Sequence, residues 1–235
     1  MPSLSGPLDD PAADAGWQDG QPRKGFFTDT SVCIGCKACE VACKEWNDVP
    51  ADFSAGLLGS SYDNTGALGA STWRHVAFIE QPKKPSSQTV SLGMPSLQRP
   101  GAAMEPDSAT EFRWLMSSDV CQHCTHAACL DVYPTGSLFR TEFGTVVVQD
   151  DICNGCGYCV PACPFGVIDR RIGERGDRGV GIAQKCTLCY DRLGAGNTPA
   201  CAQACLTQSA QFRDVDKLRE RAAVRMHPLQ SPGVT

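Results

Sequence analysis

The sequence of 235 residues predicts an α+β fold made of two small cysteine-bearing modules, one nested inside the other, with an inserted β-hairpin and a long loop. Three observations support this prediction. Fifteen cysteines fall into four groups whose spacing repeats, and short β-branched runs bounded by turn residues lie between the later groups. The longest interval without cysteine also contains a stretch rich in Pro and Ser, which is typical of a surface loop.

Two of the four cysteine groups carry the same run. The first and third groups each read C-x2-C-x2-C-x3-C, and Pro164 after the third completes the run of bacterial ferredoxins that bind two iron–sulfur clusters. The second group has Tyr133 where a fourth cysteine is expected, and the fourth group is more widely spaced. In order, the groups are Cys33, Cys36, Cys39 and Cys43; Cys121, Cys124 and Cys129; Cys153, Cys156, Cys159 and Cys163; and Cys186, Cys189, Cys201 and Cys205. We predict that all fifteen are metal ligands.

Disulfides and structural zinc are the competing interpretations of these cysteines. Disulfide scaffolds are short and secreted, with cysteine above roughly 8–10% of residues. Here it is fifteen residues of 235, and an odd count would leave one thiol unpaired. Zinc would use pairs of C-x2-C knuckles, which the third and fourth groups could supply, but it does not explain the runs of four. Iron–sulfur clusters are therefore favoured, and a zinc-stabilised non-redox scaffold is the alternative.

The composition excludes several classes of function. The net charge of −5 offers no basic footprint for nucleic acid, and no stretch approaches the ~18 apolar residues that span a bilayer. Residues 1–24 lack the apolar segment of a secretory signal, so we expect a disordered tail and a cytoplasmic protein, unless a signal-bearing partner carries it through export. No nucleophile with a base, paired-carboxylate site or P-loop is readable, which predicts a non-catalytic subunit.

The order of the groups predicts how the modules are nested. Groups two and three are neighbours and enclose a short strand, a turn at 142–144 and a strand over 145–148, with a closing strand over 165–168. Groups one and four would form the other module, although spacing alone also allows one to pair with two and three with four. The predicted divisions are a disordered tail over 1–24, a first ferredoxin-like module over 25–49 and 180–213, an insertion over 50–118, a second ferredoxin-like module over 119–179, and a C-terminal helix and tail over 214–235.

Further elements are predicted outside the cysteine groups. Thr72–Ile79 and Glu111–Met116 should form the inserted hairpin, joined by a surface loop over 81–110. Residues 170–185, rich in glycine and basic residues, should form a solvated connector. Asp214–Met226 should form a charged helix with one apolar side.

Segments around the cysteines resemble a known family. Ser31–Val49 reads SVCIGCKACEVACKEWNDV and Lys185–Arg192 reads KCTLCYDR; both resemble the iron–sulfur (β) subunits of molybdenum or tungsten formate dehydrogenases. The resemblance extends from about Gly25 to the C-terminal helix. The cysteine runs are shared with β-subunits of dimethyl sulfoxide and polysulfide reductases, and the segment Glu45–Asp48 favours formate dehydrogenase.

The resemblance implies crossed ligation, in which the fourth cysteine of each run binds the neighbouring cluster. The implied sets are Cys33, Cys36, Cys39 with Cys205; Cys186, Cys189, Cys201 with Cys43; Cys121, Cys124, Cys129 with Cys163; and Cys153, Cys156, Cys159 with Tyr133 at the missing sixteenth position. A phenol keeps its proton at neutral pH and binds iron poorly. We therefore expect three [4Fe-4S] clusters and, near Tyr133, a three-iron cluster or a four-iron cluster with a non-cysteine ligand; loss of this cluster is the remaining alternative.

Three other side chains near the cysteines are candidates for a role. His123 and His126 lie within the second group, and hydrogen bonding to a cluster is a stronger interpretation for them than ligation. Lys185 directly precedes Cys186, so its charge would raise the local potential unless it is a solvated surface lysine.

The resemblance also implies partners. It implies a separate catalytic subunit with a molybdenum or tungsten bis-pterin site and a downstream electron acceptor, between which this chain relays electrons. The alternatives are a β-subunit of another molybdopterin oxidoreductase and a stand-alone polyferredoxin. Membrane-bound members of the family carry a C-terminal transmembrane helix, and this chain ends without one, so we expect a soluble complex.

Overall fold

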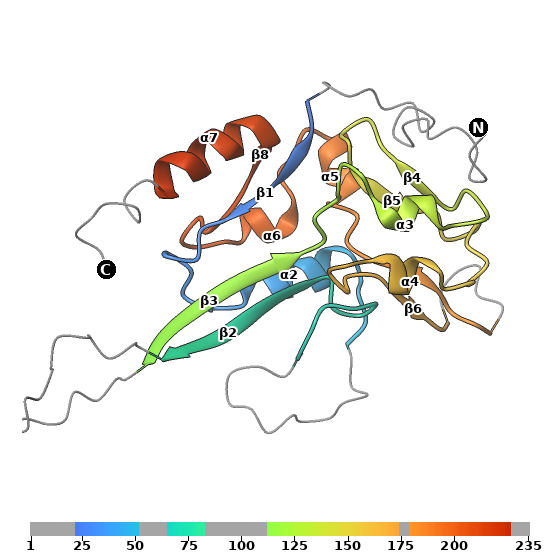
Figure 1. Ribbon diagram of the computed structural model, residues 1–235, viewed down its shortest axis with the longest axis horizontal. Helices are drawn as coiled ribbons and strands as arrows, with labels where there is room; N and C mark the ends of the chain where they lie inside the picture. The colour runs from blue at the N-terminus through green and yellow to red at the C-terminus, as the bar shows by residue number, and fades with distance from the viewer. Residues whose placement is uncertain (1–21, 52–64, 83–111, 174–178, 227–235) are drawn as a thin grey trace, which may run out of the picture.

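The computed structural model describes residues 22–51, 65–82, 112–173 and 179–226 (Figure 1). Within these ranges the chain forms four antiparallel sheets of two strands each and six helices, most of them a single turn long. The strands are β1 (Lys24–Thr28), β2 (Arg74–Pro82), β3 (Phe112–Val120), β4 (Leu138–Arg140), β5 (Val146–Val148), β6 (Asp169–Arg171), β7 (Ile182–Gln184) and β8 (Ala210–Asp214). The helices are α2 (Ala38–Trp46), α3 (Ala128–Asp131), α4 (Cys159–Ala162), α5 (Tyr190–Gly194), α6 (Ala200–Gln203) and α7 (Val215–Met226). The predicted mixture of short helices and strands is confirmed.

The first and last described strands pair with each other. β1 and β8 run antiparallel from the pair Lys24 and Asp214 to the pair Thr28 and Ala210, and an ion pair of 2.5 Å joins the first two side chains. The predicted C-terminal helix is α7, which packs on β1 and β8 and buries Leu218 (Figure 1). Segments almost two hundred residues apart in sequence therefore lie side by side.

The inserted hairpin consists of β2 and β3, paired from Arg74 and Val120 to Pro82 and Phe112. In Figure 1 it is the longest pair of strands and extends away from the rest of the molecule. Its base is buried: Arg74, His75 and Val76 at the start of β2 are all buried, and Val120 at the end of β3 packs with Val76 in the core. Residues 81 and 82, predicted to start the loop, continue β2 instead, and 83–111 lie outside the described residues.

Two predictions over residues 165–185 are wrong in detail. The closing strand begins at Asp169 rather than at 165, because Phe165 is in a turn and Gly166 has a left-handed φ of 62°. The connector over 170–185 is not fully solvated. Its beginning is β6, and its end is β7 followed by Lys185, all buried from Ile182 onward. Residues 174–178 lie outside the described residues.

The N-terminal boundary also differs from the prediction. The tail was expected to reach residue 24, but Lys24 opens β1 and donates its backbone N–H to the carbonyl of Phe143 at 3.1 Å. The carbonyl of Arg23 accepts a hydrogen bond of 2.8 Å from the backbone N–H of Val215. Arg23 and Lys24 thus connect the start of α7 with the turn between β4 and β5. Residues 1–21 lie outside the described residues.

The core has two parts, and cysteines contribute to both. One part contains Trp73, Val76, Val120 and Val167 together with cysteines from all four groups. The other contains Leu138, Val146 and Ile168 with cysteines of the second and third groups. Few large apolar residues fill this interior, so the thiols supply much of its volume. Among the described residues, no helix is long and apolar enough to cross a membrane.

Candidate metal centres

Each cysteine group contains the same unusual turn. The residue directly before the second cysteine has a left-handed φ in every group: 65° at Gly35, 43° at His123, 72° at Gly155 and 58° at Leu188. A backbone that alternates between right- and left-handed conformations points successive N–H groups toward one concavity, as at many anion and iron–sulfur sites. His123 and Leu188 adopt this conformation although it costs a residue with a side chain about 1–3 kcal/mol.

The helix α2 directs two cysteines of the first group into the core. Cys39 and Cys43 are four residues apart, so they lie on the same face of the helix, and both are buried. The side chain of Asn47, one turn later, lies 3.8 Å from the sulfur of Cys43 and 3.8 Å from the sulfur of Cys189. One amide group thereby bridges the first and fourth groups.

The fourth cysteine of the first group lies among cysteines of the fourth group. Burial, with added repulsion from Cys201 and Cys189, raises the pKa of Cys43 to about 12. Burial also raises the pKa of Cys186 well above its usual value, and the largest electrostatic contribution to that shift comes from Cys43. Thiols whose pKa values are raised in this way keep their protons at neutral pH, and metal binding would displace those protons.

One cavity collects cysteines from the second and third groups. It is lined by Cys121, Cys124 and Cys129 together with Cys163 of the third group. Burial raises the pKa of Cys129 to about 11 against the lowering effect of the Lys185 ammonium. The other three cysteines of the third group form a separate set: burial raises the pKa of Cys159 to about 11, and Cys153 and Cys156 are the cysteines that add to the shift.

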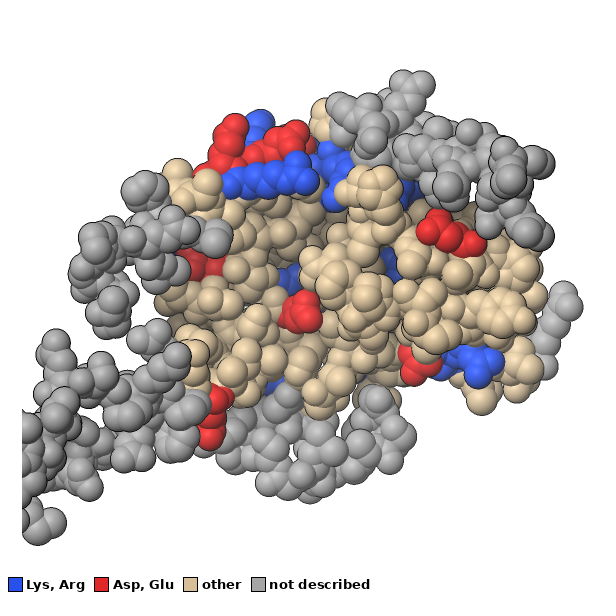
Figure 2. All heavy atoms as spheres, in the orientation of Figure 1, with Lys and Arg blue, Asp and Glu red and all other residues tan. Residues whose placement is uncertain are grey.

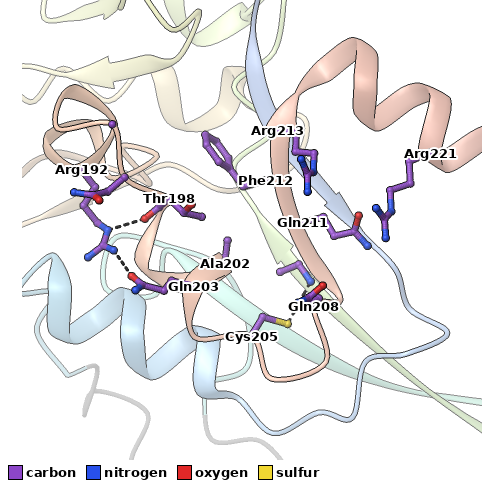
Figure 3. A pocket seen from close by; sticks show the side chains of 13 residues that line it. Arg192, Thr198, Ala202, Gln203, Cys205, Gln208, Gln211, Phe212, Arg213 and Arg221 are labelled. Atoms are coloured by element: carbon purple, nitrogen blue, oxygen red, sulfur yellow. Dashed lines mark hydrogen bonds between the residues drawn. The ribbon is translucent and has the colours of Figure 1, made fainter.

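Tyr133 and Cys205 complete the positions predicted to bind metal. Tyr133 follows α3 and packs, half-buried, in the part of the core that contains Cys153 and Cys159. Cys205 follows α6 and lines an open polar groove, where its sulfur accepts a hydrogen bond of 3.4 Å from the backbone N–H of Ala210 (Figure 3). Because α6 packs against α2, the end of the fourth group lies near the first.

The candidate histidines have different environments. His123 is buried beside Cys121 and Cys124, and its Nδ1 accepts the backbone N–H of Val146 at 3.0 Å. The ring therefore carries its proton on Nε2, which is buried without a partner among the described residues. Burial, aided by the Lys185 charge, lowers the pKa of His123 well below its usual value, so the ring is neutral. His126 is exposed.

Two residues at these sites escaped the sequence analysis. Arg74 and Ser118 lie on β2 and β3, in the interval interpreted as an insertion, yet they contact cysteine sulfurs of the first and fourth groups. The available signal was weak: an Arg beside Trp73 in a predicted strand that also contains apolar residues. Lys185 is buried, so the interpretation of this residue as a solvated lysine is wrong.

The residues present fit iron–sulfur clusters. None of the fifteen cysteines forms a disulfide, and each group contains the left-handed residue described above, a conformation common at iron–sulfur sites. Arg74 Nη2 and His123 Nε2 are buried donors without partners among the described residues, as expected where an acceptor such as cluster sulfide binds. Among all the described residues, cysteines included, no three His, Cys, Asp or Glu side chains are arranged to hold a single metal ion; in an iron–sulfur cluster each thiolate binds a different iron.

Comparisons with known proteins agree with this chemistry. A family model described as a 4Fe-4S dicluster domain matches residues 112–215. The chain is 35% identical over 206 residues to the formate dehydrogenase iron–sulfur subunit of Haemophilus influenzae, covering 87% of this chain and 56% of the relative. It is 36% identical to the thiosulfate reductase electron transfer subunit of Salmonella typhi, covering 80% and 74%, and 31% identical to the B subunit of the anaerobic dimethyl sulfoxide reductase of Escherichia coli, covering 84% and 76%.

The chain spans a little over half the length of the formate dehydrogenase subunits that it matches, but about three quarters of the two reductase subunits. Each of these matches covers at least 80% of this chain. The chain therefore belongs to the family of ferredoxin-type iron–sulfur electron-transfer subunits that includes those of formate dehydrogenase, thiosulfate reductase and dimethyl sulfoxide reductase.

Proposed function

We propose that this chain relays electrons, one at a time, between a formate-oxidising catalytic subunit that holds a molybdenum or tungsten bis-pterin and a downstream acceptor. The observation that carries the proposal is the left-handed turn that recurs in all four cysteine groups, each of which also contains at least one buried thiol. A bound iron–sulfur cluster supplies a site that takes up and gives back one electron. The protein's contribution is to space the thiols, exclude water and provide hydrogen bonds to sulfur.

The proposed ligand sets are crossed, as the family pattern implies. Contact of Asn47 with both Cys43 and Cys189 supports a site made of Cys43, Cys186, Cys189 and Cys201. The common cavity supports a site made of Cys121, Cys124, Cys129 and Cys163. The pairing of β1 with β8 supports a nested module that contains groups one and four, and with it a site made of Cys33, Cys36, Cys39 and Cys205. The remaining set has Tyr133 in place of a thiol, and we propose a three-iron cluster or one with a non-cysteine ligand there.

Exposed apolar side chains support the proposed partners. Ile34 and Val41 are exposed near the exposed thiol of Cys36, and Tyr158 and Phe165 are exposed in the segment that carries Cys156. In the view of Figure 2, charged side chains gather over α7, and the middle of the described face is largely uncharged. We infer a cytoplasmic complex, since fifteen free thiols suit a reducing compartment.

The test is a native purification under anaerobic conditions. We expect about fifteen iron atoms and a similar amount of acid-labile sulfide per chain, visible absorbance that dithionite bleaches, and a co-purifying subunit that contains molybdenum or tungsten. A folded chain without iron or sulfide would refute the proposal and favour a zinc-stabilised scaffold.

A thiosulfate or dimethyl sulfoxide reductase subunit is the second candidate. The observation that favours it is the chain's coverage of 74% and 76% of those relatives, against 56% of the formate dehydrogenase subunit. The purified complex separates the candidates: formate should reduce its clusters if the first is right, whereas thiosulfate or dimethyl sulfoxide should oxidise the prereduced clusters if the second is right.

A further inference from the structure

Two positive charges are buried inside the fold. Arg74 is 1% exposed and Lys185 is 2% exposed. Charged side chains at this depth are rare unless they are paired, because removal from water costs several kcal/mol per ion. Within the described part of the chain neither side chain forms an ion pair with a carboxylate; their contacts are with cysteine sulfurs, a hydroxyl, an aromatic ring and backbone carbonyls. The negative charge that balances them must therefore be associated with the cysteines.

Arg74 lies between the first and fourth cysteine groups. Its Nη1 is 3.6 Å from the sulfur of Cys201, and its Nε donates a hydrogen bond of 2.9 Å to Ser118 Oγ. The guanidinium also lies 4.6 Å from the ring centroid of Phe26, within the range of a cation–π contact.

Ser118 extends the contact of Arg74 to the first group. Its Oγ is 3.4 Å from the sulfur of Cys39. A guanidinium can only donate, so Ser118 Oγ accepts from Arg74, and its own hydroxyl proton is left to be donated to Cys39. Arg74 thus contacts one group directly and the other through a hydroxyl.

Lys185 lies in the same way between the fourth and second groups. Its Nζ is 3.7 Å from the sulfur of Cys121, and it donates to the carbonyls of Cys186, at 2.9 Å, and of Val146. The ammonium therefore faces a cysteine of the second group while it is held by the backbone of the fourth. Its backbone partners orient the charge toward the boundary between the two sets.

We propose that Arg74 and Lys185 are positioning cations, each of which raises the reduction potentials of the two cluster sites that it lies between. The proposal rests on the electron-relay function proposed above. Reduction adds one negative charge to a site, and a fixed positive charge in a medium of low dielectric constant stabilises that added charge. Because each cation faces two cysteine sets, its loss should shift two potentials together, and the site of Cys186 and Cys201 should respond to both cations.

The experiment is an EPR-monitored redox titration of the complex as isolated. Arg74→Gln should lower two of the cluster potentials, each by at least a tenfold change in the reduction equilibrium, about 59 mV for one electron. Lys185→Met should lower two potentials by a similar amount, one of them shared with the Arg74→Gln pair. Arg74→Lys and Lys185→Arg keep the charge and should restore most of each shift.

Two more variants test the hydroxyl link to Cys39 and the effect of a charge on the surface. Ser118→Ala keeps both cations but breaks the link to Cys39, and should lower only one potential of the Arg74 pair. Arg219→Gln removes an exposed charge on α7 and should shift none. If Arg74→Gln does not retain its clusters, the titrations of Ser118→Ala and Lys185→Met decide whether the proposal holds.

Some results would overturn the proposal. Unchanged potentials in Arg74→Gln and Lys185→Met with full iron content would do so, as would charge-retaining variants that shift as far as the neutral ones. Iron and sulfide content of the unmodified chain tests the relay function separately, so its failure is distinguishable from failure of this inference.

Discussion

His123 and Leu188 occupy the left-handed conformation that glycine takes at the matching positions of the other two cysteine groups, Gly35 and Gly155. The glycines made the tight turns of groups one and three predictable, because glycine adopts positive φ without steric cost. In groups two and four nothing in the residue type marks the turn, since a β-carbon disfavours it. There, only the cysteine spacing predicted a metal site.

Tyr133 allows a direct test at this scale. Tyr133→Cys supplies the sixteenth thiolate beside Cys153 and Cys159, so we expect any three-iron signal to disappear and one more [4Fe-4S] cluster to form. The added negative ligand should lower that site's potential by at least a tenfold change in the reduction equilibrium, about 59 mV. Quantitative EPR with iron analysis measures both effects.

Tyr133→Phe is the control for this change, because it removes the phenol oxygen and keeps the ring. The same cluster type in Tyr133→Phe and in the unmodified chain means that the oxygen is not a ligand. A [4Fe-4S] count that is identical in the unmodified chain and in Tyr133→Cys would contradict the prediction.

Strands and turns were predictable where local sequence determines them. The β-branched run of β5 marked that strand, and the apolar side of α7 marked that helix. The start of β6 and the burial of Lys185 were not predictable. Both depend on β7, which pairs with β6 and packs against the third cysteine group about thirty residues earlier in the chain. The polar composition of the segment gave no sign of these contacts. The insertion was recognised as a hairpin, but its contribution of Arg74 to the metal sites was not.

The third cysteine turn packs closely on the chain before β7. A β-carbon at Gly155, where φ is 72°, would lie 2.4 Å from the backbone oxygen of Gly181. Gly155→Ala should therefore displace the turn and speed loss of visible absorbance in denaturant at least tenfold, a measure that does not require reversible unfolding. The matched control is Gly136→Ala, because Gly136 has a φ of 76° and open space around it. Gly136→Ala should cost only the strain of the left-handed backbone, about 1–2 kcal/mol. Equal rates of absorbance loss for Gly155→Ala and Gly136→Ala would contradict the packing argument.

At the scale of the whole molecule, the first and last described strands lie against each other. β1 pairs with β8, α7 packs on both, and the first and fourth cysteine groups meet through α2 and α6. Spacing alone left the pairing of the groups open, because contacts between segments this far apart leave no local pattern. Closing so long a loop is entropically unfavourable, and metal bound by thiols from both ends would offset this cost.

Crossed ligation between the first and fourth cysteine groups has a testable consequence. If Cys43 serves the site of the fourth group, Cys43→Ser and Cys186→Ser should alter the same component of a redox titration. If Cys205 serves the site of the first group, Cys205→Ser and Cys39→Ser should alter a second component. A serine ligand should lower the potential of its site or leave a three-iron cluster there, and EPR identifies either result.

The four variants control one another, because Cys43→Ser and Cys205→Ser are each compared with one variant of the first group and one of the fourth group, Cys39→Ser and Cys186→Ser. Uncrossed ligation gives the opposite grouping: Cys43→Ser would then match Cys39→Ser, and Cys205→Ser would match Cys186→Ser. The proximity of Cys43 to Cys189 through Asn47 favours the crossed outcome. Under that outcome each of the two sites holds cysteines of both the first and the fourth group, so loss of either cluster should also loosen the pairing of β1 with β8. Hydrogen exchange at the amides of Phe27 and Gln211, which face each other in this pairing, should then rise in all four variants.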